Sequence, residues 1–352
     1  MKILLTGGAG FIGHHLVQRL LTDGHQLTLI DRLDHSGNLN RLAEIGLPNR
    51  NARFVFHDLR APINSQLAAQ IGPQDWILHL AAATHVDRSI EDPLAFVMDN
   101  VVATCNILDH ARNVGCNGFL YFGTDEVFGP APPGRRYKED ERYRSGNPYA
   151  ATKAGAEELA ISFHNTYQLP VIVTHTMNVI GERQHPEKFV PNTIAKVLAG
   201  EDVTIHADTT CTRPGSRFYI DAHDVADAIS FLLRAGSAGQ KYNIVGAEEV
   251  NNLELAQQIA QIMGRDLHYS MVSWHASRPG HDLRYALCGD KLATCGWKPP
   301  TALRATLERI VNWTLCNERW LKNAQLMEQR ADKTNVAAVG TFGKAKIKVV
   351  GY

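Results

Sequence analysis

Three polar side chains follow one apolar run of the sequence. The stretch "FLYFGTDEVFG", residues 119–129, changes from apolar residues to Thr124, Asp125 and Glu126 directly after Gly123. Two carboxyls held close together raise the pKa of one member, so that one can act as an acid and the other as a base. Such a pair is often only a solvated turn, but the carboxyl end of a parallel strand is where an open α/β sheet binds ligand. We therefore interpret these three residues as catalytic.

A tyrosine and a lysine four residues apart form a second candidate pair. The stretch "NPYAATKAGAE" places Tyr149 and Lys153 on one face near the start of an expected helix. Tyrosine, with a pKa of about 10, is a poor base at neutral pH, so we expect the lysine ammonium and a positive nicotinamide ring to favour the phenolate. An amphipathic helix with an exposed lysine would show the same spacing. The glycine-rich loop that precedes the pair in the chain favours the catalytic interpretation.

Together these groups predict a reaction that regenerates its own NAD. The tyrosine would take a proton from a sugar hydroxyl at C4 while hydride leaves for NAD, and the resulting ketone acidifies the hydrogen at C5. One carboxyl can then remove that proton while its neighbour protonates the departing C6 hydroxyl. The enone that remains takes the hydride back at C6. A simple dehydrogenase needs only the hydroxyl residue and the tyrosine, so two additional acids favour elimination of water.

The N-terminal stretch "ILLTGGAGFIGHHL" predicts the dinucleotide site. Three glycines follow the first expected strand and open the first helix, so the backbone can turn tightly and let a pyrophosphate approach bare N–H groups. Asp31 ends the second strand, where a carboxylate binds ribose hydroxyls and favours NAD over NADP, a preference that Arg32 could weaken slightly. Asp58 fits an adenine contact and a helix cap equally well. The predicted cofactor contacts are Gly7, Gly10, Phe11, Ile12, Gly13, Asp31, Asp58, Leu59, Ala81 and Ala82, together with Tyr149 and Lys153.

These groups need a scaffold, and the hydrophobic pattern indicates a doubly wound α/β fold. Short apolar runs alternate with longer segments of helical period, which is typical of a parallel sheet covered on both faces. The expected strands are 3–5, 26–30, 53–56, 76–80, 118–122 and 171–174, and the expected helices are 11–22, 63–71, 94–114, 148–167 and 188–199. After about residue 176 the pattern loosens, and the later helices expected, at 252–263 and 303–317, are shorter. This indicates a smaller C-terminal α/β region beside the sheet.

Composition excludes several classes of function. The 352 residues carry 36 basic and 36 acidic side chains, and without a charge run neither nucleic acid nor a membrane surface is expected as a partner. The six cysteines have no metal-ligand spacing, so we predict no metal site and a cytoplasmic, reducing location. No apolar run reaches the length of a membrane span.

The chain resembles the dTDP-glucose 4,6-dehydratase family of extended short-chain dehydrogenases/reductases over about residues 1–320. The resemblance rests on "GGAGFIG", "SGNLNRL", "HLAAATHVDRSI", "TDEVFG", "NPYAATKAGAE", "PEKFVP" and "RPGHDLRYAL". It implies a lyase with tightly bound NAD and a homodimer formed by helices 94–114 and 148–167. It also implies a Rossmann NAD-binding domain, residues 1–176 with 217–245 returning to it, and a sugar-nucleotide-binding domain, residues 177–216 and 246–325. Residues 330–352 are expected to be a flexible tail, with a strand docked on a partner as the alternative.

The resemblance also assigns roles residue by residue. It implies that Tyr149 is the base at C4, that Lys153 holds it and the nicotinamide ribose, and that Thr124 binds the C4 oxygen. It makes Glu126 the base at C5 and Asp125 the acid for the C6 hydroxyl. The residues implied to bind the nucleotide-diphosphate hexose are Thr84, Asn178, Lys188, Arg217 and Arg278.

Departures from the family pattern leave the substrate open. The family usually has Ser where this chain has Gly123, a second Asn where it has Val179, and an acid where it has Phe218. The loop before Phe218, residues 206–216, is longer than usual and carries an extra Arg213. The alternatives to a dTDP-glucose 4,6-dehydratase are therefore a 4,6- or 5,6-dehydratase that acts on a UDP-sugar, a dehydratase that acts on an N-acetylated hexose, and a 4-epimerase. Asp125 and Glu126 argue against an epimerase. An NAD-binding sensor without turnover is disfavoured because both Tyr149 and Lys153 are present.

Overall fold

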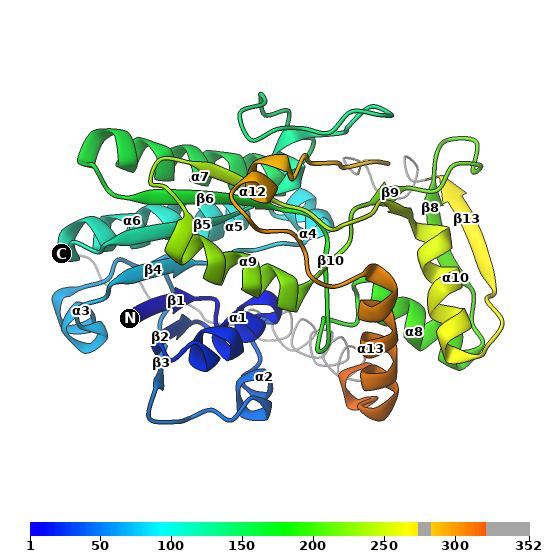
Figure 1. The fold of residues 1–352 in the computed structure, drawn as a ribbon, viewed down its shortest axis with the longest axis horizontal. Coiled ribbons are helices and arrows are strands. Elements are labelled where there is room, and N and C mark those ends of the chain that lie inside the picture. The colour runs from blue at the N-terminus through cyan, green and yellow to red at the C-terminus, as the bar shows by residue number, and fades with distance from the viewer. Residues whose placement is uncertain (274–282, 322–352) are drawn as a thin grey trace, which may run out of the picture.

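The computed structural model describes residues 1–273 and 283–321, and its centre is one parallel sheet (Figure 1). Seven strands pair in the order β11-β6-β5-β4-β1-β2-β3, all parallel. The strands are β1 (Lys2–Thr6), β2 (Gln26–Asp31), β3 (Ala52–Phe56), β4 (Trp76–His79), β5 (Gly118–Thr124), β6 (Val171–Thr176) and β11 (Lys241–Ile244). The predicted doubly wound sheet is confirmed, and β11 adds a strand to the six expected ones.

Helices cover both faces of this sheet because its strands are apolar on both sides. Strand β6 is buried at every residue, and one hydrophobic core lies on each face. Helices α1 and α9 pack together on one face, whereas α3, α6 and α7 pack on the other (Figure 1). The helices of this part are α1 (Phe11–Thr22), α2 (Leu39–Glu44), α3 (Ser65–Ile71), α4 (Val86–Glu91), α5 (Pro93–Phe96), η1 (Val97–Val102), α6 (Ala103–Val114), η2 (Asp125–Phe128), α7 (Pro148–Tyr167), α9 (Ala222–Ala235) and α12 (Asp290–Thr294).

A smaller group of elements lies beside the carboxyl ends of the strands (Figure 1). Its core is formed mainly by α8, α10 and α13, and its strands pair in twos, β10 with β7, β12 with β9 and β13 with β8. The elements are β7 (Val179–Ile180), α8 (Phe189–Ala199), β8 (Val203–Ala207), β9 (Ser216–Arg217), β10 (Ile220–Asp221), β12 (Val250–Asn251), α10 (Asn252–Met263), β13 (Tyr269–Ser273) and α13 (Leu303–Cys316). None of the described helices combines the length and the apolar character that a membrane span requires.

Two parts of the chain differ from the sequence prediction. The expected helix 94–114 is a continuous helical run, but its central turn, η1, is a π-helix that directs Asn100 into the protein. Asn100 binds both backbone groups of Ala83 and the hydroxyl of Thr152, which explains why the wider turn is stable here. Helix α9 was not predicted, although it buries nine of its residues between α1 and its neighbours.

A buried polar network joins the added strand β11 to the rest of the fold. The Glu157 carboxylate, on α7, accepts hydrogen bonds from His175 Nε2 at 3.0 Å and from the Tyr143 hydroxyl, and it pairs with Lys241 Nζ at 3.0 Å. Burial opposes ionisation of Glu157, but His175 and Lys241 outweigh it and lower the pKa of the carboxyl to about 2. Because His175 lies on β6 and Lys241 on β11, one carboxylate ties two strands to the helix that carries Tyr149.

We predict that Glu157→Gln lowers the free energy of unfolding by about 3–5 kcal/mol, because Lys241 loses its buried partner. The folded pKa of Glu157 lies below its ordinary value of 4.5, so its ionisation stabilises the protein above that pH, and this stabilisation is lost as the pH falls through about 2. The deficit of the variant should therefore shrink between these pH values. Denaturant unfolding at several pH values measures it. The exposed neighbour Glu158→Gln is the control, and equal stability of the two variants would contradict the prediction.

Candidate active site

The carboxyl ends of the central strands open into one cavity of about 330 Å³. It follows the edge at which β1, β2, β4, β5 and β6 end, as expected for a doubly wound sheet. All of the predicted cofactor and catalytic residues line it: Gly7, Gly10, Phe11, Ile12, Gly13, Asp31, Asp58, Leu59, Ala81, Ala82, Thr124, Asp125, Glu126, Tyr149 and Lys153. The sequence therefore identified a set of residues that the fold brings together.

The glycine loop at the end of β1 is packed so tightly that side chains cannot be added. Gly7 has a φ of +76°, and a Cβ there would lie 2.8 Å from Ala81 N, while a Cβ on Gly13 would collide with the Gly7 carbonyl oxygen. Gly10 is the N-cap of α1 and has no side chain to satisfy the first turn. The N–H groups of this turn are thus available to an anionic ligand.

The acids expected near the adenosine are held in place by the protein itself. Asp31 accepts hydrogen bonds from Ala9 N at 3.0 Å and Leu33 N at 2.9 Å, and burial raises the pKa of its carboxyl. Asp58 pairs with Arg60 and caps no helix, since α3 begins seven residues later. Arg32 is bound to Asp99 and Asp34, so its guanidinium is already neutralised.

The two adjacent carboxyls follow the end of β5, where Asp125 is buried and Glu126 is half-buried. The Thr124 hydroxyl donates to Asp125 Oδ1 at 3.1 Å, Asp125 Oδ2 is buried without a partner, and Asn147 Nδ2 donates to Glu126 Oε2 at 3.3 Å. Burial raises the pKa of Asp125 to about 6, and burial followed by repulsion from Asp125 raises the pKa of Glu126 to about 7. Near neutral pH the pair can therefore hold a single proton.

The tyrosine and lysine lie on one face of α7. Lys153 Nζ donates to the Phe122 carbonyl at 2.7 Å and lies 4.4 Å from the centroid of the Tyr121 ring. Burial, followed by repulsion from Glu126, raises the pKa of Tyr149. That the Lys153 ammonium and a bound nicotinamide ring favour the phenolate stays a prediction. Burial lowers the pKa of Lys153 itself to about 7.

The predicted substrate residues divide into three groups. Thr84, Asn178 and Lys188 line the cavity. Arg217 does not line it, but its charge lowers the pKa of both Asp125 and Glu126, and it lies 4.7 Å from the centroid of the Tyr285 ring. Arg278 lies outside the described residues, as does the predicted tail at 330–352.

Two departures from the family pattern have local physical explanations. A side chain on Gly123 would meet the Thr174 carbonyl oxygen at 2.5 Å, so β5 and β6 approach too closely there for serine. Phe218 is buried, with the Arg136 guanidinium 4.7 Å from its ring centroid, so an apolar residue rather than an acid fits this position.

Sequence reasoning missed two polar residues of the site. Arg41 is only 3% exposed, lines the cavity, and donates to the carbonyls of Ala9, Ser36 and Arg183. Asn147 caps α7 through Ala150 N and also binds Glu126. The "NPY" pattern, an N-cap before proline, was the available signal for Asn147, whereas a buried arginine leaves no trace in a single sequence.

Comparisons with known proteins agree with this geometry. The family model described as "NAD dependent epimerase/dehydratase family" matches residues 3–245. A dTDP-glucose 4,6-dehydratase from Streptomyces niveus is 37% identical over 328 residues, which cover 91% of this chain and 94% of that protein. The crystal structure of the dTDP-glucose 4,6-dehydratase DesIV from Streptomyces venezuelae with NAD bound superposes with a TM-score of 0.84 at 34% identity, covering 92% and 99% of the two chains. A UDP-glucose 4-epimerase from Thermus thermophilus in complex with NAD reaches 0.81 at 29% identity, covering 89% and 98%.

Proposed function

Because the chain belongs to the NAD dependent epimerase/dehydratase family, we propose that it is a nucleotide-hexose 4,6-dehydratase acting on dTDP-glucose. The single observation that carries the proposal is that the buried Asp125 and the half-buried Glu126 line one cavity with Tyr149. An epimerase, which only inverts the configuration at C4, does not need two carboxyls with raised pKa values. They supply the base and the acid that elimination of water requires.

The cavity fits an NAD molecule at its glycine end. The turn at Gly7 and Gly10 would hold the pyrophosphate, Asp31 the adenosine ribose, and Lys153 the nicotinamide ribose. Because side chains at Gly7 and Gly13 would collide with neighbouring backbone atoms, this loop presents only backbone groups to a ligand. When bound, NAD supplies the hydride acceptor at C4 of the hexose and the hydride donor at C6.

Thr124 and Tyr149 are proposed to act at C4. Thr124 and Tyr149 line the same cavity, so both hydroxyls are proposed to reach one sugar oxygen. Tyr149 takes the proton of the C4 hydroxyl. A positive nicotinamide ring nearby would favour the phenolate and offset the burial that keeps the tyrosine protonated in the free site.

Glu126 and Asp125 are proposed to act at C5 and C6. In the free site burial and repulsion from Asp125 give Glu126 the higher pKa of the two, and the bond from Asn147 opposes them by favouring the charged form. Glu126 as the base that takes the C5 proton and later returns it therefore requires the proton of the pair to lie on Asp125 in the complex with the sugar. Asp125 Oδ2, buried and unpartnered, suits the protonated acid that releases the C6 hydroxyl as water. Over the whole reaction Tyr149 gains one proton and Asp125 loses one. Transfer of one proton from Tyr149 to Asp125, directly or through solvent, therefore returns both residues to their starting protonation states.

The remaining cavity is proposed to bind the nucleotide diphosphate. Lys188 and Arg217 place positive charge near the carboxyl pair, and both lower the pKa of Glu126. Thr84 and Asn178 line the sugar side. Arginine suits the diphosphate because its planar fork pairs with two oxygens at once.

We also propose a homodimer in the cytoplasm. Several apolar side chains on the helices that are expected to form the dimer are exposed: Leu94 by 70%, Val97 by 39%, Val114 by 37% and Tyr167 by 47%. These residues belong to α5, η1, α6 and α7, and an apolar surface of this kind is typical of a protein–protein interface. The six cysteines are free thiols, which fits a reducing compartment.

The substrate is tested by incubating the purified protein with dTDP-, UDP-, GDP- and CDP-hexoses, without added NAD. We expect dTDP-glucose to give a product with near-ultraviolet absorbance in alkali, the property of a 4-keto-6-deoxy sugar. Mass spectrometry should show the loss of one water. A C4 epimer of unchanged mass would instead establish the epimerase alternative, and no change in any sugar would refute catalysis.

The acid–base roles predict a narrow pH optimum near neutrality. Below a pH of about 6 both carboxyls are protonated and no base remains, whereas above about 7 both ionise and no acid remains. Asp125→Asn and Glu126→Gln should each lower kcat by roughly 10²- to 10⁴-fold with little change in KM. In Asp125→Asn the alkaline limb of the profile should disappear.

Steady-state kinetics across pH measures both effects, with the exposed Glu201→Gln as the control. Glu126→Gln should also accumulate the near-ultraviolet absorbance of reduced nicotinamide, because elimination stalls after oxidation. Full dehydration activity in Glu126→Gln would exclude it as the C5 base.

The dimer predicts that a charge among the exposed apolar residues of these helices separates the subunits. Leu94→Glu should shift the sedimentation or light-scattering mass from a dimer to a monomer, because the carboxylate would be desolvated in the interface. Tyr269→Glu changes an equally apolar residue that is 43% exposed on β13, and it should leave the mass unchanged. A monomeric wild-type protein at micromolar concentration would refute the dimer.

A further inference from the structure

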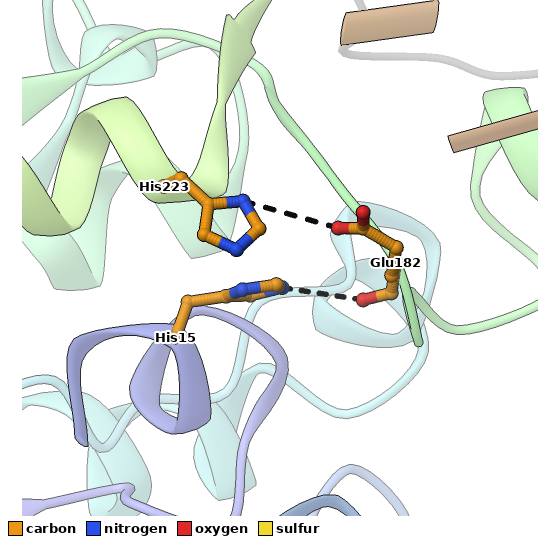
Figure 2. Close-up of side chains that lie close together, drawn as sticks. All are labelled: His15, Glu182 and His223. Carbon is orange, nitrogen blue, oxygen red and sulfur yellow. Dashed lines mark hydrogen bonds and ion pairs between the residues drawn. The ribbon is translucent and has the colours of Figure 1, made fainter. Parts of the chain in front are cut away.

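Three residues far apart in the sequence form a group with the composition of a metal site (Figure 2). His15 lies in the middle of α1, Glu182 follows β7, and His223 lies in the first turn of α9. One potential ligand atom from each of them lies within 4.8 Å of the others. The group lies outside the catalytic cavity, since none of the three residues lines it.

Two polar atoms of this group are buried and lack a hydrogen-bond partner. They are His15 Nδ1 and Glu182 Oε2, in side chains of residues that are 1% and 5% exposed. A buried polar atom without a partner costs free energy, and nothing in the described part of the chain compensates for it. A bound cation would satisfy the Glu182 oxygen directly.

The separations fit a single small ion. Two ligands bound at 2.0–2.1 Å in a tetrahedral zinc site are about 3.4 Å apart. The ligand atoms of this group lie within 4.8 Å of one another, so a small movement closes the group around an ion. The ring centroids of His15 and His223 are 4.5 Å apart, and the angle between the ring planes is 70°, so the edge of one ring faces the other (Figure 2).

The surrounding residues hold the ligands as they are held in known metal centres. Asp221 Oδ1 lies 3.2 Å from His223 Nδ1, and a carboxylate that holds one ring nitrogen of a histidine leaves the other, here Nε2, as the metal ligand. Arg309 binds Glu182 through Oε1, which leaves Oε2 to face His223. His223 is 46% exposed, which gives an ion a route from solvent.

We infer that His15, Glu182 and His223 bind one divalent transition-metal ion of the zinc class. Two imidazoles and one carboxylate are the donors that Zn²⁺, Co²⁺ and Ni²⁺ prefer, whereas Mg²⁺ and Ca²⁺ prefer oxygen ligands alone. The ion would join α1 and α9 to the segment after β7. Its expected effect is on stability rather than on the chemistry at Glu126.

The inference is tested by titrating chelator-treated, metal-free protein with Co²⁺ and following the visible absorption of the ion. Wild-type protein should bind one equivalent, and Zn²⁺ should displace it. His223→Ala and Glu182→Gln should weaken Co²⁺ binding at least about tenfold, since each removes a ligand. Glu182→Gln keeps an amide oxygen for Arg309, so it tests the ligand with little change in packing.

Two control variants locate the site. His268→Ala removes an exposed histidine elsewhere, and His185→Ala removes one from the separate group around Glu187; both should bind Co²⁺ as wild type does. Zn²⁺ should raise the melting temperature of wild type and of both controls, but not of His223→Ala. The inference is overturned if wild type binds no Co²⁺, if His223→Ala and Glu182→Gln bind it unchanged, or if His185→Ala abolishes binding.

Discussion

Burial of two adjacent carboxyls at the end of β5 is the constraint on which the site depends. Water would ionise both groups and leave an ordinary acidic turn. In this protein burial is the largest cause of the raised pKa of each, and repulsion between them is second for Glu126. A proton held between two carboxyls near neutral pH is what acid–base catalysis needs. The fold must therefore exclude water at the same point where it admits a sugar.

The sheet and α7 meet this requirement together. Strand β5 ends at Thr124, and the pair opens η2 directly after it. Asn147 precedes α7, and its side chain caps this helix and binds Glu126. The position of α7 is in turn tied to β6 and β11 through Glu157. The acid pair and Tyr149 thus keep their relative position through buried polar bonds behind the cavity. Such a network is costly to break, which suits a site that must not rearrange.

The sequence predicted most of what depends on local pattern. Helices α1, α7 and α10 have the expected bounds, and the predicted cofactor and catalytic residues all line the cavity because parallel strands end at one edge. What failed depends on tertiary context. The two-residue strands β7 and β10 have no period to detect, and α9 follows them directly. The π-helical turn and the burial of Arg41 are decided by partners that are distant in sequence.

Helix α1 belongs to both parts of the argument. Its N-terminus at Gly10 faces the cofactor end of the cavity, its back packs on α9, and His15 reaches Glu182. Glu182 follows β7 closely, and Val179, at the start of β7, lines the same cavity as Gly10. An ion between His15 and Glu182 would therefore fix the distance between the glycine loop and the sugar side of the cavity. No sequence motif could indicate such a metal site, because its three ligands are far apart in the sequence and are brought together only by the folded sheet.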